Sequence, residues 1–491
     1  MTPGWIWFGV AIYVVIAGTA ALMSRHDGEQ TMSSYFLGNR RMGGFMSAMS
    51  YSATTYSAFM LIGLAGLTYT GGVGALGFEL IYLCGVTLVL IFGPRFWLAG
   101  KKFGYVTPSE MLGDRYENRA VGVVAALCSL VFLIPYAAVQ LAGVGYLLSG
   151  MTDGEISFTS GTVLVTVLAI GFSMVAGLRS VVWTDTLQAV FMIITATLVV
   201  ILVVHELGGV SGFFNSLTNE HPGALSVPGK GFFSFSTFLG LTLPWVFFSL
   251  SNPQVSQRLF TPKTMKDMRR MLLGFMIFGF IYTLVAVTWG FAAMVKFPDL
   301  ATGDLATPTL LASSVVPTAL AIIVMIGIIA AAVSTIDSIM LTLSSMATRD
   351  VYSVVKKDAG DTEQLLVGKV MLPVIALMAY LFAQLELNLI AVLSVSASAG
   401  LLVLVPALVG AFFWRRGTAA GAIASILVAG AVVFYLEFAK VKFLGQGSGV
   451  WGLTLSVVLF VGVSLATPQP TGRAQEFMDH VRTKLADHGA I

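Results

Sequence analysis

The chain has 491 residues, of which 57% are hydrophobic and only 10% are charged, and its mean hydropathy is +0.88. Soluble domains carry about 25% charged residues, so this composition excludes an ordinary soluble domain and indicates a protein that crosses the lipid bilayer many times. The net charge of +3, without any Arg/Lys-rich arm, argues against a nucleic-acid partner. Both cysteines, Cys84 and Cys128, lie in apolar stretches, which favours packing over a disulfide or a metal pair.

Thirteen apolar stretches are predicted to span the membrane. They run over residues 5–23, 43–70, 75–99, 120–149, 158–178, 181–206, 232–251, 271–295, 314–347, 366–386, 388–411, 419–437 and 448–466. Basic residues test the orientation, because cytoplasmic loops carry an excess of Lys and Arg. If the N-terminus is outside, all 27 basic residues fall inside except Lys230, Lys296, Lys440 and Lys442. The sequence therefore predicts a cell-membrane protein with an outside N-terminus and a cytoplasmic C-terminus.

The connections between spans are too short to form a domain outside the membrane, and none indicates an obligate protein partner. The largest outside loop, 207–231, contains Gly208-Gly209 and Pro222-Gly223 and is expected to be a structured turn region. On the inside, Thr107-Pro108-Ser109-Glu110 predicts the start of a short amphipathic helix, because Pro and an early acid suit a first turn. The tail 467–491 is polar and is expected at the cytoplasmic surface.

The ninth span carries the most informative polar stretch, residues 331–338. A carboxylate at the centre of a membrane helix costs about 2.5–3.5 kcal/mol, so Asp337 is by default a functional-site hypothesis. Ser334, Asp337 and Ser338 are three and four positions apart and share one helix face. Hydroxyl and carboxylate oxygens suit a small hard cation. The alternative is that the hydroxyls, including that of Thr335, bond back to the preceding turn and ease helix packing.

The second span is interrupted by polar residues. Residues 50–57 read Ser-Tyr-Ser-Ala-Thr-Thr-Tyr-Ser, and such an interruption is the best sequence indicator of a transporter's binding site. The alternative is a helix whose hydroxyls bond its neighbours. Other polar groups at membrane depth include Glu79, Gln140 and Asp185, and a structural salt bridge to Arg179 is the competing interpretation of Asp185.

Six short motifs follow one another along the chain. They are Tyr35-Phe36-Leu37-Gly38 with Arg40-Arg41, Ser50-Tyr51-Ser52-Ala53, Trp183-Thr184-Asp185-Thr186-Leu187-Gln188, Pro253-Gln254-Val255-Ser256-Gln257-Arg258, Ala331-Ala332-Val333-Ser334-Thr335 and Arg349-Asp350-Val351-Tyr352. Each motif alone is weak, but the ordered set, which covers nearly the whole chain, resembles the sodium:solute symporter family. The resemblance implies an all-α integral membrane protein of about 13 transmembrane helices, with a LeuT-type inverted-repeat core and broken helices.

The resemblance also implies an organisation and a function. The expected parts are a first helix and cytoplasmic loop (1–42), two inverted repeats (43–206 and 207–411), two peripheral helices (412–466) and a cytoplasmic tail (467–491). The expected function is sodium-coupled import of a small organic solute, a carboxylate or an amino acid, by alternating access, with Na⁺ as coupling ion. The alternatives are proton coupling through Asp337 or Asp185, and a nutrient sensor that does not transport. An enzyme is not expected, because no histidine metal spacing or nucleophile elbow is present.

Carried over residue by residue, the main sodium site uses the backbone carbonyls of Ala53, Tyr56 and Ala331 and the hydroxyls of Ser334 and Thr335. This set agrees with the interpretation from the residues alone, in which an unwound helix supplies freed carbonyls and a straight helix supplies hydroxyls.

Some relatives have a second sodium site formed by an acid like Asp185 and by hydroxyls at the positions of Ser334, Asp337 and Ser338. Here Asp337 stands where serine is usual. The hypothesis is that Asp185 and Asp337 together bind a second cation, or that one of them carries a proton. Two close carboxylates cannot both ionise cheaply without a cation between them.

For the organic solute, the resemblance indicates Thr55 and Ser57 in the second span and Glu79 in the third. Looser expectations are Gln140 and either Phe247 or Phe248, since aromatic side chains more often belong to the core. No Arg or Lys falls in the middle of a predicted span. A carboxylate solute would therefore depend on hydroxyls, backbone amides or a sodium ion to balance its charge.

Overall fold

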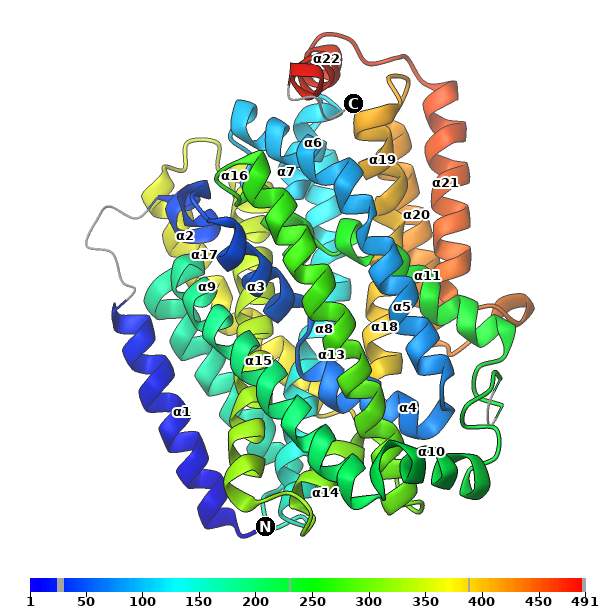
Figure 1. Ribbon diagram of the computed structural model, residues 1–491. Helices are drawn as coiled ribbons and strands as arrows, with labels where there is room; N and C mark the ends of the chain where they lie inside the picture. Colours follow the sequence, from blue (N-terminus) through cyan, green and yellow to red (C-terminus); the bar gives the residue numbers. More distant parts are fainter. Residues whose placement is uncertain (24–30, 229–230, 387–388, 488–491) are drawn as a thin grey trace.

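The computed structural model describes residues 1–23, 31–228, 231–386 and 389–487. Over these residues the chain is a bundle of helices without strands, apart from one isolated bridge between Met42 and Pro262. The N-terminus and α22 (Arg473–Asp487), the last described helix, lie at opposite ends of the bundle (Figure 1), as an odd number of crossings requires. Lys230, one of the four basic residues expected outside, is not among the described residues.

Helices occupy all the predicted spans. The crossing elements are α1 (Pro3–Met23), α3 (Gly44–Thr55) with η2 (Phe59–Leu64) and α4 (Ala65–Gly71), α5 (Gly74–Val86) with α6 (Leu88–Phe103), α8 (Arg119–Met151), α9 (Phe158–Glu206), α11 (Phe235–Ser251), α13 (Met265–Lys296), α15 (Thr318–Met346), α17 (Asp361–Ala383), α18 (Ile390–Leu401) with η6 (Leu402–Leu404) and α19 (Val405–Phe413), α20 (Ala419–Phe438), and α21 (Ser448–Ala466). Within the described ranges, nine helices are long and apolar enough to cross a membrane, and three shorter apolar stretches accompany them. The protein is therefore a multi-pass membrane protein.

The two predicted spans over 158–178 and 181–206 are both present, as apolar helix over Phe158–Met174 and over Thr184–Glu206. They belong to one helical element, α9. The chain enters α9 just after Met151, whose carbonyl accepts the N-terminal amine, and leaves it at α10 (Gly209–Glu220), which lies at the same end of the bundle as the N-terminus in Figure 1. The side chains of residues 175–180 and 183, which include Arg179, are not among those described.

Short elements complete the chain between the spans. They are α2 (Met32–Leu37), η1 (Gly38–Arg40), α7 (Pro108–Arg115), α10 (Gly209–Glu220), α12 (Pro253–Ser256), η3 (Gln257–Phe260), η4 (Gly303–Leu305), α14 (Ala306–Ala312), η5 (Ala347–Tyr352), α16 (Ser353–Val355), η7 (Phe443–Gly445) and α22 (Arg473–Asp487). The predicted helix after Thr107 is confirmed as α7, and the Thr107 hydroxyl caps it by accepting the Glu110 amide hydrogen at 2.9 Å. The helix α10, in the loop expected to be a turn, and the tail helix α22 were not foreseen in the sequence.

The second span is broken near its middle. The helix α3 ends at Thr55, and Tyr56 leaves the helical region with φ −93° and ψ 81°. The chain then resumes as the π-helical turn η2, whose first amide, that of Phe59, donates to the Ser57 hydroxyl at 3.2 Å. Serine and threonine favour such breaks because their hydroxyls offer the backbone an alternative partner. The predicted interruption at residues 50–57 is therefore a real break at Tyr56–Ser57.

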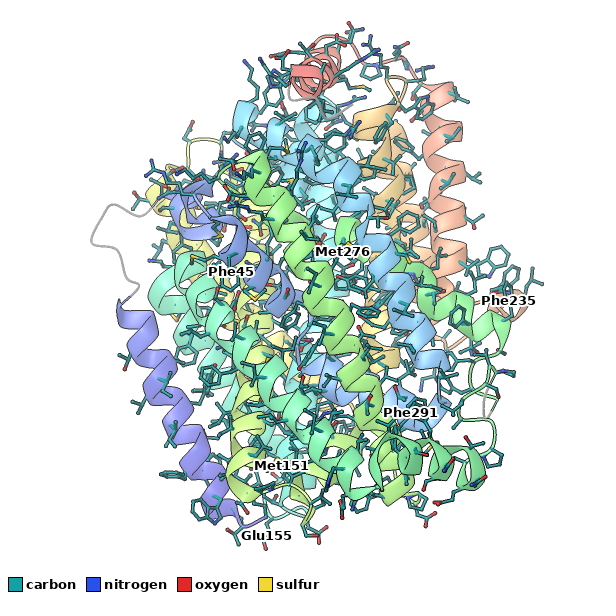
Figure 2. The ribbon with its side chains drawn as sticks, viewed as in Figure 1. Phe45, Met151, Glu155, Phe235, Met276 and Phe291 are labelled. Carbon is teal, nitrogen blue, oxygen red and sulfur yellow. The ribbon has the colours of Figure 1, made fainter. Side chains whose placement is uncertain are left out.

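The periphery of the bundle is apolar. In Figure 2, Phe235 at the start of α11 lies at the edge of the molecule, where it is 79% exposed, and Phe45 on α3 is 63% exposed. Polar backbone there is enclosed in helices, as a hydrocarbon environment requires. The buried polar side chains are instead concentrated where α3, α9 and α15 meet.

A buried carboxylate connects the short element η4 with the start of α18. Asp304, in η4, is 2% exposed, and its Oδ2 accepts the amide hydrogen of Ile390, the first residue of α18, at 3.1 Å. The element η4 also packs closely against α4 of the broken span. At this contact only glycine fits at position 66, because a Cβ there would lie 2.8 Å from the Gly303 carbonyl. Burial raises the pKa of Asp304, which lies in a connection between spans, to about 7.

We predict a pH-dependent stability that Asp304→Asn removes. Because the pKa of Asp304 is higher in the folded than in the unfolded chain, its contribution to stability is full below about pH 4 and is lost as the pH rises through about 7. Asparagine keeps an oxygen for Ile390 but does not titrate. Between about pH 5 and about pH 8, the melting temperature in detergent should fall by a few degrees less in this variant than in the wild type. Asp153→Asn, at an exposed position, is the control and should follow the wild type. Parallel curves for all three proteins would contradict the prediction.

Candidate functional site

The break in the second span faces the polar stretch of α15. The Thr335 hydroxyl donates to the Ala53 carbonyl at 3.0 Å, so two of the predicted sodium ligands contact each other across the interface between α3 and α15. Ala331 lies one turn before Thr335 on α15, and Tyr56 follows Ala53 at the break; both are buried. This part of the predicted set is therefore brought together, and carbonyl and hydroxyl oxygens are ligands that a small hard cation accepts.

Ser334, the remaining predicted ligand, bonds in another direction. Its hydroxyl donates to Oδ1 of Asp185 on α9, and the Ser50 hydroxyl donates to Oδ2 of the same carboxylate at 2.6 Å. Ser338, one turn further along α15, lies 3.3 Å from the Thr54 hydroxyl. Asp185 is thus fully buried at the junction of α3, α9 and α15, which excludes an interfacial position for it.

Asp185 has its own cationic partner, Arg258 of η3. The guanidinium Nη2 lies 3.8 Å from Asp185 Oδ2, and both side chains are buried. The same guanidinium donates to the hydroxyls of Ser50 and Ser338, each at 2.6 Å. Additional hydrogen bonds stabilise a buried ion pair of this kind, and the two serines contribute such bonds to both Nη atoms of Arg258, while its Nε has no partner in the described part of the chain.

Sequence reasoning missed Arg258 as a site residue. It lies after the end of a predicted span, where it counts as a loop charge that marks the cytoplasmic side. The signal that points to it is its place at the end of the Pro253–Arg258 motif, seven residues before α13 begins at Met265. Asp185 thus forms a salt bridge with Arg258, whereas the side chain of Arg179, the partner suggested by the sequence, lies outside the described residues.

Asp337 is held separately from Asp185. Its Oδ1 accepts a hydrogen bond from Ser173 Oγ at 2.8 Å, and the Ser173 carbonyl in turn accepts the Tyr35 hydroxyl at 2.7 Å. With Tyr13 and Gln188 it lines a crevice of about 10 Å³, room for about one water-sized sphere. Among the described residues Asp337 makes no ion pair, so its charge has no protein counter-ion there.

Glu79 lies in a buried aromatic cage. Its side chain is 1% exposed and accepts a hydrogen bond from Trp245 Nε1 at 3.2 Å. The Trp245 ring centroid lies 5.0 Å from that of Phe248 and 5.2 and 5.3 Å from two further phenylalanines, Phe59 and Phe78. The structure thus brings together Glu79 and Phe248, two of the residues predicted to contact a solute.

The other predicted solute residues take different positions. Thr55, at the end of α3, is buried, and its hydroxyl has no hydrogen-bond partner in the described part of the chain. Gln140 is fully buried on α8, and neither atom of its amide has a hydrogen-bond partner in the described part of the chain. Buried polar atoms are normally paired, so this amide suits a polar ligand. Ser57, by contrast, uses its hydroxyl to cap η2.

A membrane helix broken at mid-depth, a straight helix that offers hydroxyls to the break, and a buried polar cage beside them define a secondary transporter. The profile of the sodium:solute symporter family matches residues 35–429. The chain belongs to this family, and it is therefore a membrane symporter that couples a small solute to sodium rather than an enzyme.

Individual comparisons agree. The chain is 30% identical to the sodium/pantothenate symporter of Escherichia coli (strain K12), with 94% of this chain and 96% of the relative covered. It is 27% identical to the sodium/proline symporter of Haemophilus influenzae, with 88% of each covered.

Solved structures establish the fold. A Na⁺-coupled sialic acid symporter in a substrate-bound outward-open state has a TM-score of 0.79 at 20% identity, over 95% of this chain and 98% of that one. Mhp1, a nucleobase-cation-symport-1 family transporter in a closed conformation, has a TM-score of 0.59 at 13% identity, over 90% and 97%. The predicted all-α fold with a LeuT-type core and broken helices is confirmed.

We predict that Arg258 and Asp185 stabilise the fold only as a pair. Arg258→Ala or Asp185→Ala leaves one buried charge uncompensated, which costs about 3–5 kcal/mol. Arg258→Met combined with Asp185→Leu removes both charges and should recover most of the loss. The thermal stability of each variant is measured by heating the detergent-solubilised protein and determining the remaining folded fraction by size-exclusion chromatography. If the double variant were as unstable as the sum of the single variants, the two residues would not be coupled.

Proposed function

We propose that this chain imports a small organic solute, a carboxylate or an amino acid, with Na⁺ bound at the break in the second span. The contact between the Thr335 hydroxyl and the Ala53 carbonyl carries the proposal, because it joins the freed backbone of one helix to the hydroxyl face of another. The carbonyls of Tyr56 and Ala331 and the Ser334 hydroxyl complete the proposed ligand set. In this set Ser334 must exchange its bond to Asp185 for one to the ion.

Sodium at this point links two moving parts of the transporter. The ion draws the end of α3 and the middle of α15 together, which stabilises the conformation open to the outside and raises the affinity for solute. Coupling of this kind is typically about 1–3 kcal/mol and is reciprocal, so the solute raises the affinity for sodium by the same factor.

The proposed solute site is the cage around Glu79, with Thr55, Gln140 and Phe248 as further contacts. Glu79 suits an amine or hydroxyl hydrogen of the solute, and the Gln140 amide, which has no partner in the described chain, suits a polar group. The named solutes of the relatives above, pantothenate and proline, both carry a carboxylate. In this site the sodium ion and the backbone freed at the break balance such a charge.

A second cation is proposed at Asp337. Asp185, the other candidate together with Ser338, is already neutralised by Arg258. Asp337 has one hydrogen-bond donor, Ser173, and makes no ion pair among the described residues. A cation that binds in this part of the protein is therefore held by Asp337, with Asp185 contributing only if Arg258 moves away.

The proposed orientation places the N-terminus outside the cell membrane and the C-terminus in the cytoplasm. The termini at opposite ends of the bundle support it, as does the concentration of Lys and Arg on one side. The two inverted repeats proposed for residues 43–206 and 207–411 would then cross the membrane in opposite senses.

The proposed function predicts a current that requires both sodium and one solute. Purified protein in proteoliposomes is screened against carboxylates and amino acids, first in sodium and then in choline. Thr335→Ala removes a sodium ligand and should raise the half-saturating sodium concentration at least about tenfold. This corresponds to a loss of about 1.4 kcal/mol in the free energy of sodium binding. Thr335→Ser keeps the hydroxyl and is the matched control. Sodium-specific thermal stabilisation without current for any solute would favour a sensor.

Asp337→Asn distinguishes the coupling ions. If a second sodium binds there, the variant should move one charge fewer per solute molecule than the wild type. Uptake should continue, because the sodium ion at the main site still drives it. If a proton is carried instead, the wild-type current persists in choline and follows pH, and the variant loses that pH dependence. Transport with unchanged ion ratio, sodium dependence and pH dependence would rule out a cation at this residue.

A further inference from the structure

A crevice of about 770 Å³ lies between α8, α11, α17, α18 and the connection from α20 to α21. That connection lies beside the start of α11, at the right edge of Figure 1, where the Ser236 hydroxyl donates to the Gly445 carbonyl. In the proposed orientation this is the outer end of the bundle. None of the cation-site residues lines the crevice.

The crevice adjoins the proposed solute cage. Phe132 of α8 and Leu241 of α11 line it. Four residues further along the same helices lie Tyr136 and Trp245, which are both within 5.7 Å, centroid to centroid, of the Phe248 ring. Positions i and i+4 share one helix face, so the crevice wall is continuous with the cage along α8 and α11. Because these two helices cross the membrane in opposite directions, the cage lies beside the crevice at a similar depth.

The mouth of the crevice is positively charged. Lys440 and Lys442 line it, and both are exposed. They are two of only four basic residues on the predicted outer side. The one acid that lines the mouth, Glu437, accepts a hydrogen bond from the Ser448 hydroxyl. The charged groups at the mouth therefore sum to one net positive charge.

We propose that this crevice is the outer entrance for the solute, and that Lys440 and Lys442 select a small organic anion with an apolar body. The inference rests on the proposed function and names its substrate class. A cleft lined by one sign of charge, with low-dielectric walls, concentrates ions of the opposite sign, and the effect decreases as ionic strength rises. Apolar walls then accept the body of the solute on its way to the cage.

An acyl chain of a lipid is the competing occupant. The rings of Phe434 and Phe438 at the mouth are 53% and 82% exposed, so the crevice borders the lipid-facing surface. The continuity of its wall with the solute cage favours the aqueous entrance, because a lipid site has no reason to end at buried polar groups. Accessibility to water-soluble reagents separates the two.

The test uses Ser396→Cys, a half-buried position of α18 in the crevice wall, in a chain with Cys84 and Cys128 replaced by alanine. Anionic 2-sulfonatoethyl and cationic 2-trimethylammonioethyl methanethiosulfonate are applied to the outside of proteoliposomes. The rate at which each reagent modifies the introduced cysteine is divided by its rate of reaction with a free thiol in solution. The anion-to-cation rate ratio should exceed one at low ionic strength and fall about three- to tenfold in Lys440→Asn/Lys442→Gln. Asparagine tolerates the φ of 53° at Lys440.

Ser211→Cys, exposed on α10, is the control, and its rate ratio should not change with the lysine substitutions. An unchanged ratio at Ser396→Cys would overturn anion selection by the lysines. Modification only by a lipophilic maleimide would show a lipid-filled crevice and overturn the entrance. The labelling requires neither sodium nor transport, so a failure here is distinct from a failure of the proposed symport.

Discussion

A broken helix inside a membrane is tolerable only if other groups satisfy the backbone that the break exposes, and in this protein α15 meets that requirement. The Thr335 hydroxyl bonds the Ala53 carbonyl just before the break, while Ser57 bonds the amide just after it. The position of α15 against α3 therefore follows from the break. The polar residues that make α15 unusual as a membrane helix are the ones that this contact uses.

Buried charge is the second constraint, and the protein treats its two intramembrane aspartates differently. Asp185 is neutralised by Arg258 and by hydroxyls from α3 and α15, so it holds three helices and η3 together. Asp337, two residues after Thr335, accepts a hydrogen bond from one hydroxyl in the described part of the chain, that of Ser173. Asp185 is thus a structural residue beside the proposed sodium site, whereas Asp337 is the carboxylate proposed to bind a second cation.

The proposed solute cage and the proposed ion sites lie between different helices of the bundle. Glu79, Trp245 and Phe248 line a cage between α5 and α11, whereas the ion sites lie between α3, α9 and α15. The broken span belongs to both, since the Tyr56 ring lies 6.1 Å, centroid to centroid, from the Tyr82 ring beside Phe248, and the Ala53 carbonyl contacts Thr335. A movement at the break is therefore felt at both sites, which is the structural basis for coupling.

The sequence by itself determined the spans, the break and the polar face of α15, because hydropathy and the spacing of hydroxyls are local properties read along one helix. It also identified the family through short motifs. Only the tertiary structure decided the partners: Arg258 reaches Asp185 across 73 positions of the chain, and Asp337 turns to Ser173 instead of to Asp185. Neither could be predicted, because a charge at the end of a span looks like a loop residue until the packing of distant helices buries it.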